Sequence, residues 1–117
     1  MLKKSDLIKY FENGIKNTSE IKIGTEHEKF IYHKSDLSLV PYSGDVSINS
    51  IFEDFIQDGW RPVIENENII ALNKDRASIT LEPGGQFELS GAPLKTIHDT
   101  CKEINNHLAF TKKLEEK

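Results

Sequence analysis

Two glutamates in the first quarter of the chain, Glu26 and Glu28, are spaced so that they could share one metal ion. The side-chain pattern over residues 20–32 has a period of two, which predicts a β-strand there. Residues two apart on a strand point to the same face, so both carboxylates would face the same way. Such a pair more often lies on a solvated strand face than in a metal site. The pair alone therefore indicates little chemistry.

A second acidic pair, Glu82 and Glu88, strengthens the case. Polar residues alternate with apolar ones in both segments that carry this pair. These polar residues are Ser78, Thr80 and Glu82, followed by Gln86, Glu88 and Ser90. Four carboxylates converging on one sheet face would repel each other unless a cation neutralised them. Oxygen ligands without thiolates or imidazoles favour magnesium or manganese, ions that commonly accompany nucleotide phosphates. The residues thus indicate a metal-dependent reaction linked to ATP.

The elements that must position these residues follow from hydrophobic spacing and turn signals. Helices are predicted over residues 5–16, over residues 47–58 and from Leu94 to the chain end. Strands are predicted over 20–32, 60–64, 69–72, 77–82 and 86–90. Residues 65–68 read as a hairpin turn, and Pro83-Gly84-Gly85 as a bulge or bend that joins two strand pieces. This order predicts an α+β fold with a mainly antiparallel sheet.

Two further side chains of possible chemical interest are given structural roles. His27 alternates with the glutamates and is expected on the opposite face of its strand. Cys101 falls in an apolar seam of the last helix and is expected to be a small core residue. The seam consists of Ile97, Cys101, Ile104 and Leu108. His98 lies one turn from Cys101, but no second ligand pair accompanies them as zinc would require.

The composition narrows the class of protein. With 117 residues the chain is one domain or part of one. Its net charge is −4 and its lysines form no basic stripe, so nucleic acid is an unexpected partner. The longest apolar run, residues 69–72, is far below the roughly 20 residues needed to cross a bilayer. No apolar leader follows Met1, and the single cysteine suits a reducing compartment, so a cytoplasmic protein is expected.

Two longer stretches carry a resemblance to a known family. They are residues 24–30, Gly-Thr-Glu-His-Glu-Lys-Phe, and residues 81–94, Leu-Glu-Pro-Gly-Gly-Gln-Phe-Glu-Leu-Ser-Gly-Ala-Pro-Leu. Both resemble signature stretches of the plant-type glutamate-cysteine ligases. Further similarity, through residues 60–63, 68–70 and 97–108, extends it over nearly the whole chain from Ile23 onward.

The resemblance implies a glutamine-synthetase-like sheet and a reaction among three small molecules. ATP phosphorylates the γ-carboxylate of glutamate, and the amino group of cysteine attacks the acyl phosphate to give γ-glutamylcysteine, the first step of glutathione synthesis. Carried over by position, the four acidic residues would be the magnesium ligands, and two polar neighbours would contact substrate. The ligands are Glu26, Glu28, Glu82 and Glu88, and the substrate contacts are Gln86 and Ser90.

The resemblance also implies that residues 1–117 form a single incomplete domain, the N-terminal part of a larger catalytic domain. No catalytic residue is assigned within the chain, and the isolated polypeptide is expected to be inactive, because a pocket for three substrates needs more walls. Two alternatives stay open. One is a related ligase that joins glutamate to another amine. The other is a non-catalytic module that binds a divalent cation, or a partner subunit through an open sheet edge.

Overall fold

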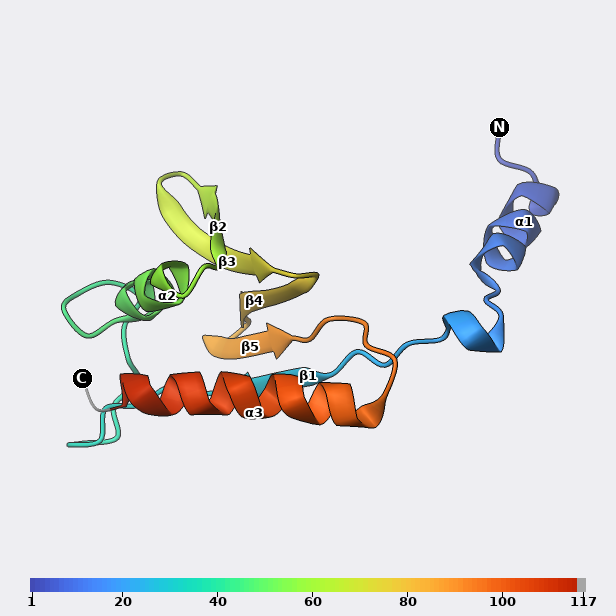
Figure 1. Ribbon diagram of the computed structural model, residues 1–117. Helices are drawn as coiled ribbons and strands as arrows, with labels where there is room; N and C mark the ends of the chain where they lie inside the picture. The colour runs from blue at the N-terminus through green and yellow to red at the C-terminus, as the bar shows by residue number, and fades with distance from the viewer. Residues whose placement is uncertain (116–117) are drawn as a thin grey trace.

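The computed structural model describes residues 1–115, and its centre is an antiparallel sheet of five strands in the order β1-β5-β4-β3-β2 (Figure 1). The strands are β1 (Glu26–Lys29), β2 (Arg61–Glu65), β3 (Asn68–Lys74), β4 (Ala77–Glu82) and β5 (Gln86–Ser90). The helices are α1 (Lys4–Gly14), α2 (Ile48–Gln57) and α3 (Ile97–Leu114), with a 3-10 turn, η1, at Thr18–Glu20. The α+β class predicted from the sequence is confirmed.

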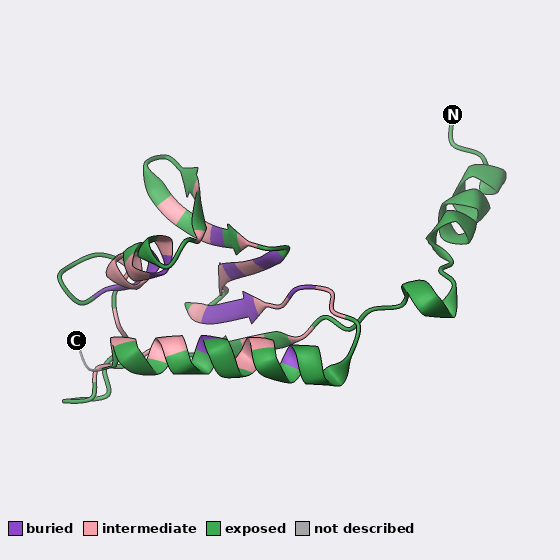
Figure 2. Cartoon of the chain, viewed as in Figure 1, coloured by how far each residue is buried: buried purple, intermediate pink, exposed green. Residues whose placement is uncertain are grey.

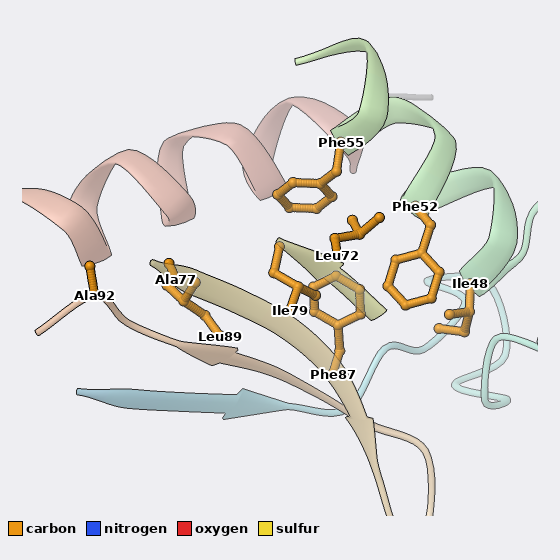
Figure 3. Packing of buried hydrophobic residues seen from close by; sticks show 9 residues of the cluster. All are labelled: Ile48, Phe52, Phe55, Leu72, Ala77, Ile79, Phe87, Leu89 and Ala92. Atoms are coloured by element: carbon orange, nitrogen blue, oxygen red, sulfur yellow. The ribbon is translucent and has the colours of Figure 1, made fainter. Parts of the chain in front are cut away.

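The core lies between one face of the sheet and the helices α2 and α3 (Figure 3). Helix α2 starts at a Ser47 cap, whose hydroxyl accepts a hydrogen bond from the Ser50 N–H at 3.1 Å, as its sequence predicted. Its Phe52 and Phe55 are almost completely buried, and so is Phe87 of β5. Burial of such side chains contributes about 1.5–3 kcal/mol each. This packing decides which face of the sheet is covered.

Helix α3 turns a different stripe toward the core from the one its sequence suggested. Its buried residues are Thr100 and His107, whereas Ile97 is 57% exposed and Cys101 is exposed. The expectation of Cys101 as a core residue is therefore wrong. The stripe that packs on the sheet includes polar residues at helical spacing, which a search for apolar residues overlooks. The helix also begins after a Thr96 cap instead of at Leu94, and residues 116–117 of its predicted extent lie outside the described residues.

The strand predicted over residues 20–32 is shorter than expected. β1 covers only Glu26–Lys29, because it is an edge strand and its single neighbour, β5, extends only from Gln86 to Ser90. Beyond it the chain makes only isolated bridges, between Ile23 and Leu94 and between Tyr32 and Leu39. Both glutamates of the predicted pair remain inside the regular strand.

Two tight turns connect the strands that follow α2. The β2–β3 hairpin predicted at residues 65–68 is confirmed, with Asn66 and Glu67 at φ values of 46° and 68°. The Pro83-Gly84-Gly85 segment, expected as a bulge or bend that joins two strand pieces, does join two strands, and it does so as a hairpin loop and not as a bulge. Strands β4 and β5 are antiparallel neighbours, with Glu82 opposite Gln86. Both glycines have φ near +80°, a conformation that glycine adopts at little cost.

Helix α1 stands apart from the rest of the molecule (Figures 1 and 2). None of its residues is buried, and Phe11, on its predicted apolar stripe, is 75% exposed. The radius of gyration is 18.0 Å, well above the value of about 13 Å typical of a compact chain of this length. The helix predicted from the sequence is therefore present, but its apolar stripe does not pack against the sheet or the other helices. Along residues 1–115, no helix combines the length and the apolar character needed to cross a membrane.

Candidate metal site on the open face of the sheet

The strand register places all four predicted metal ligands on the face of the sheet opposite the helices. Residues paired across antiparallel strands share a face. Glu28 lies opposite Glu88, and Glu26 lies opposite Ser90. On the other side of β5, Thr80 pairs with Glu88. Glu82 and Gln86 also pair, so the predicted substrate contacts share this face, which we call the acidic face. It comprises Glu26, Glu28, Ser78, Thr80, Glu82, Gln86, Glu88 and Ser90.

Hydrogen bonds between neighbouring side chains orient three of the four carboxylates. The Gln86 amide donates from Nε2 to Glu28 Oε2 at 2.8 Å, which links β5 to β1. The Thr80 hydroxyl donates to Glu82 Oε1 at 3.1 Å. The Ser90 hydroxyl donates to Glu88 Oε1. A carboxylate has two oxygens and about four acceptor positions, so each retains capacity for a cation.

Burial differs across the acidic face. Glu88, on the inner strand β5, is 7% exposed, whereas Glu26 and Glu28 on the edge strand are exposed. A buried carboxylate is costly unless it is paired or bound to a metal. The ion pairs found between residues 1 and 115 are Lys34–Glu115 and Lys74–Asp58, and neither involves this face. A cation from outside the chain would therefore relieve a cost that its own lysines and arginines do not.

The donor types fit a hard divalent ion, but the carboxylates are not drawn together around one point. In the part of the chain that the structure describes, no three or more His, Cys, Asp or Glu side chains are grouped closely enough to hold a metal. Magnesium usually takes only one or two protein carboxylates and completes its shell with water and substrate phosphates. An open face of carboxylates suits that mode of binding better than an all-protein cage.

The opposite face carries a basic cluster that sequence reasoning missed. His27 points to this side, as predicted, with its ring 5.9 Å from that of His107. Lys29 Nζ lies 2.7 Å from His107 Nε2, and since an ammonium only donates, this nitrogen accepts. Burial, and then Lys29 and His27, lower the pKa of His107 to about 4. Burial also lowers the pKa of Lys29 to about 8. His107 is therefore a neutral core residue near pH 7.

A groove of about 430 Å³ also lies on the helix side, between α3 and the sheet. The residues that line it include Phe55, Trp60, Leu89, Lys102 and Glu103. The groove does not coincide with the acidic face. The groove and the predicted chemistry thus lie on opposite sides of the sheet.

Comparison with known proteins agrees with the motifs in the sequence. The family model described as glutamate-cysteine ligase family 2 matches residues 22–116. The chain belongs to this family. It is 47% identical over 116 residues to "Glutamate--cysteine ligase, chloroplastic" of Nicotiana tabacum and 48% identical over 117 residues to that of Medicago truncatula. In both cases the match covers 98% of this chain and 22% of the relative.

A third relative, "Glutamate--cysteine ligase A, chloroplastic" of Oryza sativa subsp. japonica, is 46% identical over 108 residues. The chain thus spans about a fifth of the length of the curated relatives it matches. The names of these relatives contradict the expectation of a cytoplasmic protein, since all three are chloroplastic. That expectation rested on a search for an apolar leader, and plastid transit peptides are amphipathic segments that such a search does not detect.

Proposed function

We propose that this chain supplies the acidic part of an active site that joins glutamate to cysteine, using ATP and magnesium. The product, γ-glutamylcysteine, belongs to glutathione biosynthesis. The single observation that supports this most is the register of β1, β4 and β5. It places four family-motif carboxylates on one face of the sheet, away from the core. Family membership supports the reaction, and the donor chemistry of the face supports the ion.

The proposed roles follow from position on the acidic face. Glu26, Glu28, Glu82 and Glu88 hold magnesium, each as one of few protein ligands to an ion. Bound magnesium supplies charge neutralisation to the phosphate groups of ATP. Gln86 and Ser90 lie between the carboxylates and present an amide and a hydroxyl to glutamate. Because Gln86 already bonds to Glu28, contact with substrate and alignment of that ligand are coupled.

We expect the isolated chain to be inactive as a ligase. Its acidic face is open, and a site for three small molecules needs walls that bury most of each ligand. The described residues put the helices and the 430 Å³ groove on the other side of the sheet. Steady release of γ-glutamylcysteine from purified chain, ATP, glutamate, cysteine and magnesium would contradict this expectation.

Metal binding is the direct test of the acidic face. Manganese serves as a paramagnetic stand-in for magnesium, and its binding is followed by calorimetry and electron paramagnetic resonance with and without ATP. We expect weak binding that ATP strengthens and magnesium competes away, and loss of binding in the double variant Glu28→Gln/Glu88→Gln. The matched control is Glu65→Gln/Glu67→Gln, which removes two exposed charges at the β2–β3 turn. Equal manganese affinity in both double variants would overturn the proposed metal site.

Association through a sheet edge is a second, non-catalytic candidate. In the described sheet, β1 and β2 are the edge strands, each hydrogen-bonded on one side only. Unpaired edges favour addition of another strand. Light scattering at increasing concentration checks this, since a monomer throughout would argue against it. An acceptor other than cysteine also remains a prediction, and a screen of amines with a full-length relative would decide it.

A further inference from the structure

We propose that Glu103 of α3 is a positioning residue that fixes the strand junction carrying Glu26. This inference rests on the proposed function, because Glu26 is one of the proposed metal ligands. Glu103 lies on the helix side of the sheet and is absent from the acidic face. It would act on the metal site only through the backbone to which it is bonded.

The first observation is a direct link from helix to strand end. Glu103 Oε1 accepts a hydrogen bond from the Ala92 N–H at 2.9 Å. Ala92 is 8% exposed and follows directly after Gly91, whose N–H donates to the Thr25 carbonyl at 2.7 Å. Thr25 in turn precedes Glu26, which pairs with Ser90 in the last step of the β1–β5 ladder. One carboxylate thus abuts the ends of both strands.

The second observation is a pair of buried oxygens without partners. Among the described residues, Glu103 Oε2 and Thr25 Oγ1 are both buried and make no hydrogen bond. Both border the same point, where a Cβ on Gly91 would stand. That point is 2.9 Å from Thr25 Oγ1 and closer still to Glu103 Oε2. An unsatisfied buried polar group costs about 1–3 kcal/mol. A hydroxyl that donates to the carboxylate would satisfy both groups and tie Glu103 to the residue before Glu26.

The position of Glu26 explains why such a tie would matter. β1 has four residues, forms an edge of the sheet and pairs only with β5. Strand ends of this kind fray readily. The next backbone contact outward is the Ile23–Leu94 bridge, with two hydrogen bonds of 2.8 Å. Metal ligands must be held to about 0.5 Å for good binding, and Glu103 sits at the step between the bridge and the ladder.

The test compares Glu103→Ala and Glu103→Gln with the control Asn106→Ala, an exposed position on the same helix. Amide hydrogen exchange is measured without metal by NMR, and manganese affinity by calorimetry. For Glu103→Ala we expect roughly tenfold faster exchange at Gly91 and Ala92, whose N–H groups donate to the Thr25 carbonyl and to Glu103, and roughly tenfold weaker manganese binding, as loss of one charge-assisted hydrogen bond implies. Glu103→Gln retains an acceptor for Ala92 and should recover most of both. The control should change neither.

The outcomes separate this inference from the proposed function. If the wild-type chain binds manganese and Glu103→Ala binds it equally well, the positioning role is wrong while the metal site stands. If the wild-type chain binds no manganese, the proposed site fails, and exchange at Gly91, whose N–H donates to the Thr25 carbonyl, then decides whether Glu103 fixes the junction. Unchanged exchange at Gly91 in Glu103→Ala overturns the role in either case. Should Glu103→Ala fail to fold, a folded Glu103→Gln with wild-type exchange and affinity would support the hydrogen bond to Ala92 as the tie.

Discussion

The two faces of the sheet differ most clearly along β5. Phe87 and Leu89 point to the helices and are 0% and 2% exposed. Glu88, between them, points to the acidic face and is nearly as buried, at 7%. The same strand therefore buries hydrocarbon on one side and a carboxylate on the other. Helices α2 and α3 lie on the hydrocarbon side (Figure 3).

This difference teaches that burial has opposite meanings on the two faces. A buried aromatic ring stabilises the fold by leaving water. A buried carboxylate costs free energy unless a partner compensates it. A destabilising feature such as a buried carboxylate, in a sequence that otherwise agrees with its fold, is typical of a functional site. The helix face therefore stabilises the fold, and the buried carboxylate supports the ligand-binding role proposed for the acidic face.

The largest expected effect on stability comes from substituting Phe87, and it is compared with a substitution of its neighbour Glu88. Phe87→Ala should lower the free energy of unfolding by about 3–5 kcal/mol, because it leaves a cavity against Phe52 and Phe55. Glu88→Gln should change it by less than about 1 kcal/mol in either direction, since the lost hydrogen bond is offset by a smaller burial cost. Urea denaturation followed by circular dichroism measures both. A larger loss in Glu88→Gln than in Phe87→Ala would reverse the assignment of the two faces.

The next largest effect is a loss of stability in acid, caused by protonation of His107 on the helix side of the sheet. The pKa of His107 is about 4 in the folded protein, below its ordinary value of 6.5, because the ring is buried. Between these values the unfolded chain binds more protons, so stability falls as the pH drops from 6.5 to 4 and is flat below. We expect a loss of about 1–3 kcal/mol over this window.

The matched variant for the acid effect is His107→Phe, which keeps a ring against Phe55 but removes the titrating group. Its unfolding free energy should lose the part of the pH dependence between 6.5 and 4 that belongs to His107. Lys29 adds the same sign at higher pH. Its pKa is lowered to about 8 from 10.5 by burial, so stability should rise as the pH increases from 8 to 10.5. A wild-type stability that rises on acidification to pH 4 would contradict the buried neutral histidine.

The sequence predicted the strands and the acidic face well because both follow from period-two alternation. Alternation in β4 and β5 is local and fixes which residues share a face. What joins the two acidic pairs is the register between β1 and β5, which are far apart in the chain. Alternation within either segment does not reveal that register. The turn at Gly84 was misjudged for a related reason, since a loop that reverses the chain and a bend that continues it share the same residues.

The sequence failed where polar residues are buried and apolar residues are exposed. On α3 the stripe with Cys101 is the more apolar one, yet Thr100 and His107 face the core. Thr100 is satisfied by donating from its hydroxyl to the Ile97 carbonyl at 2.8 Å, and Nε2 of His107 by the contact with Lys29. Such satisfaction depends on partners in space, and so it leaves no periodic signal along the chain.

A smaller effect is expected on the acidic face itself. Glu28 and Glu88 are directly opposite each other, and like charges in that position are destabilising. Glu28→Gln should therefore raise the free energy of unfolding by about 0.5 kcal/mol at low salt, with a smaller gain at high salt because Glu28 is exposed. Magnesium should stabilise the wild-type chain more than the variant. Equal shifts in melting temperature on adding magnesium would argue against Glu28 as a ligand.

The smallest effect on stability is expected for a substitution in α1. This helix shows that an apolar stripe need not be buried. Phe11 of α1 and Phe55 of α2 both lie on apolar helix stripes, but they are 75% and 1% exposed. Phe55→Ala should lower the free energy of unfolding by about 3–5 kcal/mol, whereas Phe11→Ala should change it by less than about 0.5 kcal/mol. Denaturation at low protein concentration measures both. A loss of 2 kcal/mol or more for Phe11→Ala would mean that α1 is covered in solution, and apolar stripes would then predict burial on both helices.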